Sequence, residues 1–595
     1  MKLLSYQTRN TELDLLKGIA IIAVVLYHFA GSVLPFGYLG VEIFFVISGY
    51  LLMKSLLRSI ADEEFSFVKQ ISHRVLRLLP AVLAMSALSF IAGYIVMLPD
   101  DFENLAQSII ASTGFANNIL AAITTKNYWD VVNLFKPLMH TWYLGVLVQA
   151  YVVIIGITTI CNKFATKKYL ALKLLFSLVT VVSLVLYLIP SFPQAWKFYF
   201  LPFRLFEITI GSLIALATPL DNRKCRPFLS TTVKVACVIA ILATVFINTT
   251  VLPANSKLLI TVALTAVYTH FTIVSPAPFI IVFKPFAFLG RNSFPVYISH
   301  QCVVAFFYYS FIYETSVAAF AVFIAVVALF SLIIHFGIEK PVNHILKLKQ
   351  QKKLWLACIL VAVLVCGASG LVYLNAGVVR DVPELDVSVQ NAHRGMHAAY
   401  CDIPYAWDKD FTEDDNVKVL VIGDSFGRDW ANILNESGIS EDIEISYIYN
   451  GNPDYEEKVL RRAKAADVVF SGIASQTSVP EFITDNIPKE KLWIVGYKNF
   501  GNSNGYIYKF RFEADYLNKT QTLPDSTLTH NSQMKHIYQD HYIDMLEVVL
   551  QGRNQVRVFT DDGRFISQDC RHLTKAGAQF YAAALDLSWI VQPLE

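Results

Sequence analysis

The sequence predicts a multi-span α-helical membrane domain followed by an extracytoplasmic α/β domain with a mainly parallel sheet. Of the 595 residues, 55% are hydrophobic and only 16% are charged, and the mean hydropathy of +0.47 is too high for a soluble protein. Between Leu13 and Ala376, apolar runs of roughly 17–25 residues follow one another, each long enough to cross a bilayer as a helix. From Asp381 onward these runs stop.

The apolar runs predict about ten spans in a first domain and one more that links this domain to the rest of the chain. The first span carries early charges and lacks the cleavage pattern of a signal peptide, so we interpret it as a retained helix. The expected spans cover residues 14–34, 38–56, 79–98, 142–160, 170–189, 203–219, 231–247, 257–274, 293–312, 315–337 and 354–376.

Basic residues are distributed unevenly between alternate loops. One set of loops holds most of the Lys and Arg and ends with "EKPVNHILKLKQQKK", whereas the other set includes "PDDFENLAQ" and "NTTVLPANSK". Loops rich in Lys and Arg stay in the cytoplasm, so we expect the amino terminus inside and, after an odd number of spans, everything beyond Ala376 outside. A net charge of +2 gives no indication of nucleic acid as a partner, and the expected partner is the lipid bilayer.

The first expected span carries three titratable residues on one face. Asp14, Lys17 and His28 fall within about 60° of one another, among neighbours that are nearly all apolar. A charged group inside a bilayer is costly and normally faces a cavity or a partner. The alternative is an interfacial Asp–Lys pair together with a histidine that is satisfied within the core.

Further polar residues lie in or beside the expected spans. Arg74 and Arg77 share one helix face before the third span, as Arg204 and Glu207 do in a later span. The other members of this group are His140, His300 and Glu339. This many polar groups predicts a lined site in the membrane domain rather than scattered anchors.

Six stretches, in this order, resemble the membrane acyltransferase-3 family: "LDLLKGIAIIAVVLYHF", "GYLGVEIFFVISGYLL", "HRVLRLLPA", "HTWYLGVLVQAYVV", "NSFPVYISH" and "IEKP". The resemblance covers the membrane domain, residues 9–345, and implies an enzyme that O-acylates carbohydrates at the cell surface. It matches His28 to the family's essential histidine. Arg74 and Arg77 match its arginine pair. Glu339 matches its acidic residue near the end of the domain and is assigned, with His28, to the catalytic residues of the membrane domain.

Three positions depart from the family's pattern. Lys17, Glu42 and Gln149 stand where Arg, Asp and Glu are usual. Lys17 keeps its charge but lacks the planar group that binds phosphate through two hydrogen bonds. Gln149 cannot ionise, which excludes it as a base.

The family's donor is an acyl-CoA, usually acetyl-CoA, which is a cytoplasmic substrate; no bound cofactor and no metal site are expected. By the resemblance, the residues assigned to acyl-CoA binding are Arg74, Arg77, Lys17 and Asp14. His28, deeper in the span, is expected to act as general base or transient acyl acceptor. In the alternative, the arginines merely reflect the concentration of basic residues on the cytoplasmic side.

Beyond an eleventh span and linker at residues 346–415, the α/β domain at residues 416–595 is predicted from alternating strands and helices. "NVKVLVIGDSFGRDWANIL" has the pattern of a strand, a tight turn and a helix, which places Ser425 at a helix amino terminus. Further strands are expected in "IEISYIYN", "ADVVFSGI", "KLWIVGY" and "QVRVFT". This alternation indicates a mainly parallel sheet with its active site at the carboxyl ends of the strands. Taken alone, however, Gly-Asp-Ser is more often an ordinary turn.

The late sequence "DCRH" supplies two partners for the serine. Asp569 can accept a hydrogen bond from one ring nitrogen of His572, leaving the other nitrogen to take the proton of Ser425. An early GDS with a late Asp-x-x-His resembles the SGNH hydrolase and acetyltransferase superfamily. The resemblance implies Ser425 as nucleophile, His572 as base and Asp569 as the residue that orients the base. In the alternative, Asp569 only caps the helix that begins near Thr574.

The same resemblance implies donors that stabilise an oxyanion. The backbone N–H of Ser425 is one, and Gly451 in "YNGNPD" matches the second. The family's asparagine after the third strand is not visible, so Gln476 or Asn499 is expected in its place. Separately, Cys401 and Cys570 are the cysteines of the polar part, where they form either a disulfide or free thiols.

A membrane acyltransferase joined to an SGNH domain is a known arrangement among bacterial enzymes that O-acetylate lipopolysaccharide O-antigen, peptidoglycan or other surface polysaccharides. We therefore expect this chain to transfer an acyl group from acyl-CoA across the bacterial inner membrane to a cell-surface glycan acceptor. Two alternatives stay open: a transporter of an acyl donor or glycan precursor, and an extracytoplasmic carbohydrate esterase.

Overall fold

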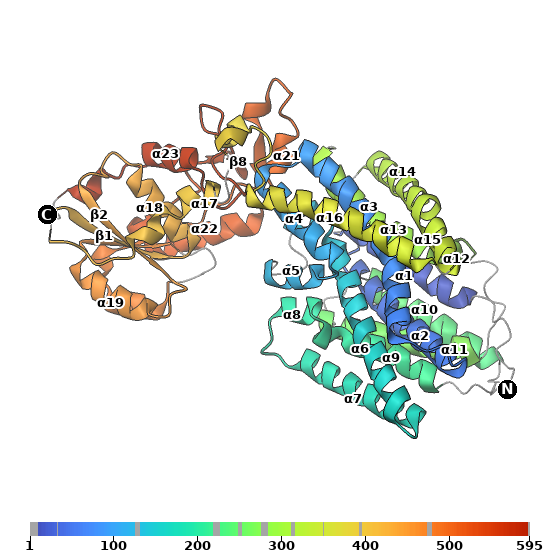
Figure 1. Cartoon of the computed structure of the whole chain (residues 1–595). Coiled ribbons are helices and arrows are strands. Elements are labelled where there is room, and N and C mark those ends of the chain that lie inside the picture. The colour runs from blue at the N-terminus through green and yellow to red at the C-terminus, as the bar shows by residue number, and fades with distance from the viewer. Residues whose placement is uncertain are drawn as a thin grey trace. The chain divides into compact units, whose positions relative to one another are not determined.

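The computed structural model divides into two compact units, Met1–Ile95 with Asn104–Gly370 and Val96–Glu103 with Leu371–Glu595 (Figure 1). The residues that the structure describes are 10–31, 34–124, 131–217, 227–247, 253–274, 284–310, 316–348, 350–391, 396–413, 415–472, 479–501 and 503–592.

Long apolar helices build the first unit, and each expected span corresponds to one helix. The long helices are α1 (Thr11–Phe29), α2 (Gly40–Ala61), α3 (Phe67–Val96), α6 (Trp142–Phe164), α7 (Lys168–Leu188), α9 (Leu201–Ala217), α10 (Pro227–Phe246), α11 (Ala254–Val274), α13 (Ser293–Ser310), α14 (Val317–Ile334) and α16 (Gln351–Leu374). Shorter helices are α4 (Pro99–Thr113), α5 (Asn117–Thr124), α8 (Gln194–Tyr199), α12 (Lys284–Arg291) and α15 (Lys340–Lys347). The helical part of the predicted fold class is therefore confirmed.

Within the described residues, eight helical stretches are long and apolar enough to cross a membrane, judged by length and composition alone. The helix α1 is not one of them, because Glu12, Asp14 and Lys17 lie in its amino-terminal part. These charges are paired inside the protein: Lys17 Nζ lies 2.7 Å from Asp14 Oδ1, and Lys234 Nζ lies 2.8 Å from Glu12 Oε2. The expected number of spans stays a prediction.

Small residues allow α2 and α9 to approach closely. A methyl group at Gly49 would lie 1.8 Å from the carbonyl oxygen of Ile208, and one at Gly211 would lie 2.0 Å from that of Val46. In a membrane, where lipid is as apolar as the side chains, helices associate through such close backbone packing. This contact brings residues of two distant segments together around the buried Arg204.

The second unit contains a five-stranded sheet in the order β2-β1-β3-β4-β6, and all of its strand pairs are parallel. The strands are β1 (Val417–Gly423), β2 (Ile443–Tyr449), β3 (Val468–Gly472), β4 (Leu492–Val495) and β6 (Tyr542–Ile543). Two apolar cores pack against the sheet; one includes Trp430 of α18 (Ser425–Asn435) and Tyr581 of α23 (Lys575–Ala584), and the other includes Val459 of α19 (Tyr455–Ala465). The predicted parallel α/β architecture is confirmed.

One predicted strand belongs to a different sheet. Residues Gln555–Arg557 of "QVRVFT" form β8, which pairs in antiparallel fashion with β5 (Thr520–Thr522) and β7 (Leu550–Gln551). Its alternation of half-buried and buried residues suits a sheet that is covered on one side. The fifth strand of the main sheet is the two-residue β6, which is too short to give a pattern in the sequence.

The segment expected to be a linker contains short helices. Among the residues that the structure describes, these are α17 (Met396–Cys401) and three 3₁₀ turns at Pro383–Leu385, Val389–Asn391 and Ile403–Trp407. The amide of Asn432 in α18 donates to the carbonyl oxygen of Cys401 at 3.3 Å. This segment therefore packs onto the helix that begins with Ser425.

Candidate active site

Ser425 is the first residue of α18, at the carboxyl end of β1. Gly423 makes the turn possible because its φ of 149° is open to glycine, and a methyl group there would lie 1.8 Å from the carbonyl oxygen of Gly472. Asp424 caps the helix, since its Oδ1 accepts the N–H of Phe426 at 2.9 Å. The turn therefore presents Ser425 at the edge of the sheet where ligands of parallel sheets bind.

Ser425, His572 and Asp569 form one hydrogen-bonded chain. His572 Nε2 lies 2.8 Å from Ser425 Oγ, and His572 Nδ1 lies 2.6 Å from Asp569 Oδ2. A carboxylate only accepts, so Nδ1 carries the proton and Nε2 of the neutral ring has the lone pair that can take the serine's proton. The structure thus brings together the three residues that the sequence singled out.

The carboxylate of Asp569 is held in place by the loop that carries it. Its Oδ1 accepts the backbone N–H groups of Arg571 at 3.0 Å and His572 at 2.7 Å. Burial by itself raises the pKa of Asp569, but these hydrogen bonds and the one from the imidazole outweigh burial and lower that pKa to about 2. Asp569 is therefore ionised at physiological pH. The alternative cap does not form, because Thr574 itself caps α23 by accepting the N–H of Gly577 at 3.0 Å.

Asp429, one turn after the serine, fixes the position of the loop that carries His572. Its Oδ2 accepts the N–H of Leu573 at 2.9 Å and lies 3.0 Å from Lys498 Nζ. Both charged side chains of this ion pair are only 2% exposed, and Lys498 also lies 3.4 Å from the ring centre of Phe426. Sequence reasoning missed this pair; the signal was an aspartate one helical turn from Ser425, on a helix with an apolar face.

The structure describes three of the four residues that were expected to stabilise the oxyanion. Ser425 lies at the amino terminus of α18, as expected, and Gly451 lies in the turn after β2. Asn499 is buried, and its Oδ1 accepts hydrogen bonds from Gly501 N–H at 2.9 Å and Arg571 Nη1 at 2.7 Å. Gln476 lies outside the described residues.

Cys401 and Cys570 are free, buried thiols. The sulfur of Cys401 donates to the carbonyl oxygen of Leu573 at 3.5 Å, whereas that of Cys570 donates to Asn504 Oδ1 at 3.3 Å. Burial raises the pKa of each thiol to about 12. Of the two states that the sequence left open, the structure has the free thiols.

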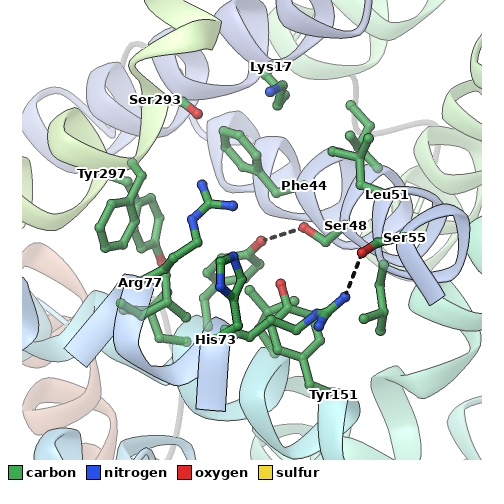
Figure 2. A pocket seen from close by; sticks show the side chains of 18 of the residues that line it. Lys17, Phe44, Ser48, Leu51, Ser55, His73, Arg77, Tyr151, Ser293 and Tyr297 are labelled. Atoms are coloured by element: carbon green, nitrogen blue, oxygen red, sulfur yellow. Dashed lines mark hydrogen bonds between the residues drawn. The ribbon is translucent and has the colours of Figure 1, made fainter. Parts of the chain in front are cut away.

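The membrane unit contains a cavity of about 330 Å³ (Figure 2). Four of the predicted residues line it, namely Lys17, Arg74, Arg77 and Glu339. Figure 2 shows the side chains of Lys17 and Arg77 entering the cavity from different helices. Three cations and one carboxylate give the cavity an excess of positive charge, which suits an anionic ligand such as the phosphates of a nucleotide.

Two cations of this cavity, Arg74 and Lys17, have polar partners. Arg74 donates from Nη1 to Gln70 Oε1 at 2.6 Å and from Nη2 to Ser55 Oγ at 3.2 Å. Asp14 pairs with Lys17, and Glu339 Oε2 lies 2.7 Å from His335 Nδ1. Asp14 is therefore placed to orient the Lys17 ammonium group, and it does not itself line the cavity.

His28 lies outside the lining of this cavity, in a buried cluster with His300 and His140. The rings of His28 and His300 have centres 5.0 Å apart, and those of His140 and His300 are 5.3 Å apart. Tyr297 connects the cavity to this cluster: it lines the cavity, its hydroxyl donates to the carbonyl oxygen of His140 at 2.7 Å, and its ring lies 5.5 Å from that of His300. The spacing of Tyr297 and His300 in "SFPVYISH" was the signal for this contact.

Hydrogen bonds define the tautomers of His28 and His300. His300 Nδ1 donates to the carbonyl oxygen of Tyr297 at 2.6 Å, so its Nε2 is an acceptor in the neutral ring. His28 Nδ1 lies 2.9 Å from the carbonyl oxygen of Val24 and 3.3 Å from His300 Nε2, and both of these atoms require a donor. The proton of His28 is therefore on Nδ1, and the lone pair is on Nε2, the atom that a base or an acyl acceptor uses.

Glu42 and Gln149 have structural partners. Both oxygens of Glu42 accept from Arg204 Nη2, at 2.7 and 2.8 Å, and Glu207 Oε1 lies 3.0 Å from Arg204 Nη1. All three side chains of this ion cluster are completely buried. Gln149 donates to Asn118 Oδ1 at 2.9 Å. The sequence placed Arg204 and Glu207 on one face, but only the packing of α2 on α9 adds Glu42.

Comparison with known proteins assigns the family. A peptidoglycan O-acetyltransferase from Listeria monocytogenes is 28% identical over 305 residues, which are 49% of this chain and 49% of that protein. An uncharacterized protein from Haemophilus influenzae is 31% identical over 193 residues, which are 31% of this chain and 76% of that protein. The chain spans about half the length of the Listeria relative. No solved structure matches the chain.

The parallel sheet of the second unit, with Ser425 after its first strand, is compatible with an SGNH-like domain. In the first unit, the family whose description reads "acyltransferase domain" matches residues 10–336, more than half of the 595 residues. This chain belongs to the membrane acyltransferase-3 family.

Proposed function

We propose that the protein is an O-acetyltransferase of the bacterial inner membrane that transfers an acetyl group from acetyl-CoA to hydroxyls of a cell-surface polysaccharide, such as lipopolysaccharide O-antigen or peptidoglycan. In this proposal the amino terminus is cytoplasmic and the α/β unit lies outside the cytoplasm. The hydrogen-bonded chain of Ser425, His572 and Asp569, in a protein of an acyltransferase family, is the observation that carries the proposal.

The cavity in the membrane unit is proposed as the site for acyl-CoA. The guanidinium groups of Arg74 and Arg77, with the ammonium of Lys17, would neutralise the phosphates of CoA. Tyr297 lines this cavity and its ring lies 5.5 Å from that of His300, which in turn lies against His28. His28 Nε2, which carries the lone pair, would then either take a proton from the attacking group or accept the acyl group transiently.

Ser425 is proposed to carry the acyl group outside the membrane. Its Oγ attacks the carbonyl carbon of the acyl donor while His572 Nε2 takes the hydroxyl proton, and the backbone N–H of Ser425 stabilises the negative charge on the carbonyl oxygen. Collapse of this first intermediate breaks the bond between the acyl carbon and the donor's leaving group, which takes the proton from His572 Nε2 and leaves the acyl-serine with a neutral imidazole. A sugar hydroxyl then attacks the acyl-serine and gives its proton to His572 Nε2. Collapse of this second intermediate releases the sugar ester and returns the proton to Ser425 Oγ.

Mass spectrometry of surface polysaccharides from cells carrying His28→Ala or Ser425→Ala tests the proposal. Matched controls are His270→Ala and Ser588→Ala, which change exposed residues. We expect ester groups to disappear in the first two variants and to persist in the controls. Unchanged acetylation in both site variants would refute the mechanism, and an increase of ester in Ser425→Ala would instead indicate an esterase.

A second test addresses location. Fusion of a periplasmically active phosphatase to the carboxyl terminus of the full chain should give active phosphatase, because the α/β unit is proposed to lie outside. An inactive fusion that is present in the membrane at normal levels would remove the reason for a transfer across the bilayer.

A further inference from the structure

Two tyrosine rings lie together on the surface of the α/β unit. Tyr405, in the 3₁₀ turn Ile403–Trp407, is 40% exposed, and Tyr449, at the end of β2, is 38% exposed. Their ring centres are 5.8 Å apart and their planes meet at 83°. Ile403 beside them is 39% exposed. Apolar groups that are exposed singly are ordinary, whereas a contiguous aromatic pair marks a binding surface.

This pair lies next to the turn that presents the serine. Tyr449 is the register partner of Gly423, and the N–H of Asn450 donates to the carbonyl oxygen of Gly423 at 3.0 Å. The ring of Tyr405 lies 5.6 Å from that of buried Tyr447, whose hydroxyl donates to the carbonyl oxygen of Asp424 at 2.9 Å. The backbone of Tyr449 is therefore paired with the residue two before Ser425, and the ring of Tyr405 is linked to Asp424 through Tyr447.

Charged groups lie at the edge of the aromatic pair. Arg428 is one helical turn after Ser425, and its Nη1 donates to Asp402 Oδ1 at 3.1 Å. Asp402 is 49% exposed, whereas Arg428 is 12% exposed and so is held in a defined position. The segment that carries Tyr405 also contacts the loop of the base, since the sulfur of Cys401 donates to the carbonyl oxygen of Leu573.

We infer that Tyr405 and Tyr449 form a platform that binds a sugar ring of the acceptor glycan, with Asp402 and Arg428 available for its hydroxyl groups. A pyranose ring has an apolar face of C–H groups and a rim of hydroxyls, which matches an aromatic face bordered by a carboxylate and a guanidinium. Binding there excludes water from the acyl-serine and holds a hydroxyl near it, which favours transfer over hydrolysis. The inference rests on the proposed function and adds to it the site of the acceptor.

The step that the platform serves is the second half of the transfer. The sugar oxygen forms a bond to the acetyl carbon, the bond from that carbon to Ser425 Oγ breaks, and the sugar's proton passes through His572 Nε2 to Ser425. No oxidant or further reactant is needed.

The test compares two activities of the full chain in the double variant Tyr405→Ala/Tyr449→Ala. The first is polysaccharide ester content in the native strain, with the gene deleted and the variant supplied in its place. The second is hydrolysis of 4-nitrophenyl acetate by the purified protein, a reaction that contains no sugar. We expect the ratio of transfer to hydrolysis to fall about tenfold or more, because both ring faces are lost. The double variant Tyr405→Phe/Tyr449→Phe should restore the ratio, and Phe512→Ala, which removes an aromatic ring that is 86% exposed, should not change it.

A normal ratio in the alanine double variant would overturn the inference. A parallel loss of both activities, restored by phenylalanine, would show that the rings support the serine rather than the sugar, and would also overturn it. Failure of the proposed function looks different: Ser425→Ala would then leave both the ester content and the 4-nitrophenyl acetate rate unchanged.

Discussion

Asp569→Asn should inactivate the serine by changing which nitrogen of His572 carries the proton. In the structure Asp569 Oδ1 accepts two backbone N–H groups, from Arg571 and His572, while Oδ2 accepts from His572 Nδ1. The two backbone N–H groups can only donate, so the single side-chain oxygen of an asparagine must occupy the Oδ1 position to accept from them. Its NH₂ group then faces Nδ1, which must become an acceptor.

The consequence follows from the geometry at the other end of the ring. The proton moves to His572 Nε2, 2.8 Å from Ser425 Oγ, where a lone pair is required. Loss of the correct tautomer costs roughly 10³–10⁴-fold in rate for such triads, which is about 4–5.5 kcal/mol at 1.36 kcal/mol per tenfold. Because hydrogen bonds hold the pKa of Asp569 at about 2 in the native protein, its carboxylate stays ionised as pH falls and is lost only near that value. Protonation of Asp569 therefore cannot account for any loss of activity between pH 7 and pH 5.

The assay is the rate at which a fluorophosphonate labels Ser425 in the purified full chain, since this reaction needs neither CoA nor a glycan. A matched control is Asp586→Asn, which changes an exposed aspartate that also accepts from a backbone N–H, that of Ser588. The control should label at the native rate, and thermal unfolding should be similar for both variants. A labelling rate for Asp569→Asn within tenfold of the native rate would refute the tautomer argument.

Three further predictions concern other parts of the chain. Gly423→Ala should destabilise the α/β unit by about 3 kcal/mol or more, because the new methyl group would meet a carbonyl oxygen at 1.8 Å and the φ of Gly423 is positive. The control Gly438→Ala, at a glycine with open space around it, should change the free energy of unfolding by less than about 0.5 kcal/mol. Equal effects of the two substitutions in thermal unfolding would contradict this prediction. Cys401 and Cys570 should resist alkylation by iodoacetamide at pH 8 in the native protein. The thiolate is the reactive form, and burial raises the pKa of each thiol to about 12, so little thiolate is present at pH 8. Rapid alkylation detected by mass spectrometry, or a disulfide between the two cysteines, would contradict the structure. His300→Ala should lower polysaccharide acetylation about tenfold through loss of one buried hydrogen bond to the first-helix histidine, while CoA binding, measured by calorimetry, stays normal; equal loss of CoA binding would show a wider disturbance of the membrane unit.

Much of the geometry around Ser425 was visible before the fold was known, because it depends on short stretches. A strand that ends in a GDS turn places Ser425 at a helix start by local geometry alone, and Asp569 and His572 are three residues apart. The contact between these two stretches joins His572 to Ser425, which are 147 residues apart in the sequence. It was predicted from resemblance, and no local pattern contains it.

The pairing of strands was less accessible. Strand β8 has the pattern of a strand, but which sheet it joins depends on partners far along the chain, and β6 has only two residues. Sheet membership is decided by backbone hydrogen bonds between distant segments, so it leaves little trace in either segment.

By itself the sequence determined where the long helices of the membrane unit lie, the position of the serine turn and the residue types available for chemistry, because hydrophobic periodicity and turn conformation are local properties. Only the tertiary structure decided which polar residues meet. It placed Lys17, Arg74, Arg77 and Glu339 around one cavity, placed His28 in a histidine cluster outside the lining of that cavity, and brought the exposed rings of Tyr405 and Tyr449 together next to the strand that ends before Ser425. These contacts depend on how helices and strands pack against one another. Packing depends on the fit between faces built from residues far apart in the sequence, so no single stretch of sequence shows it.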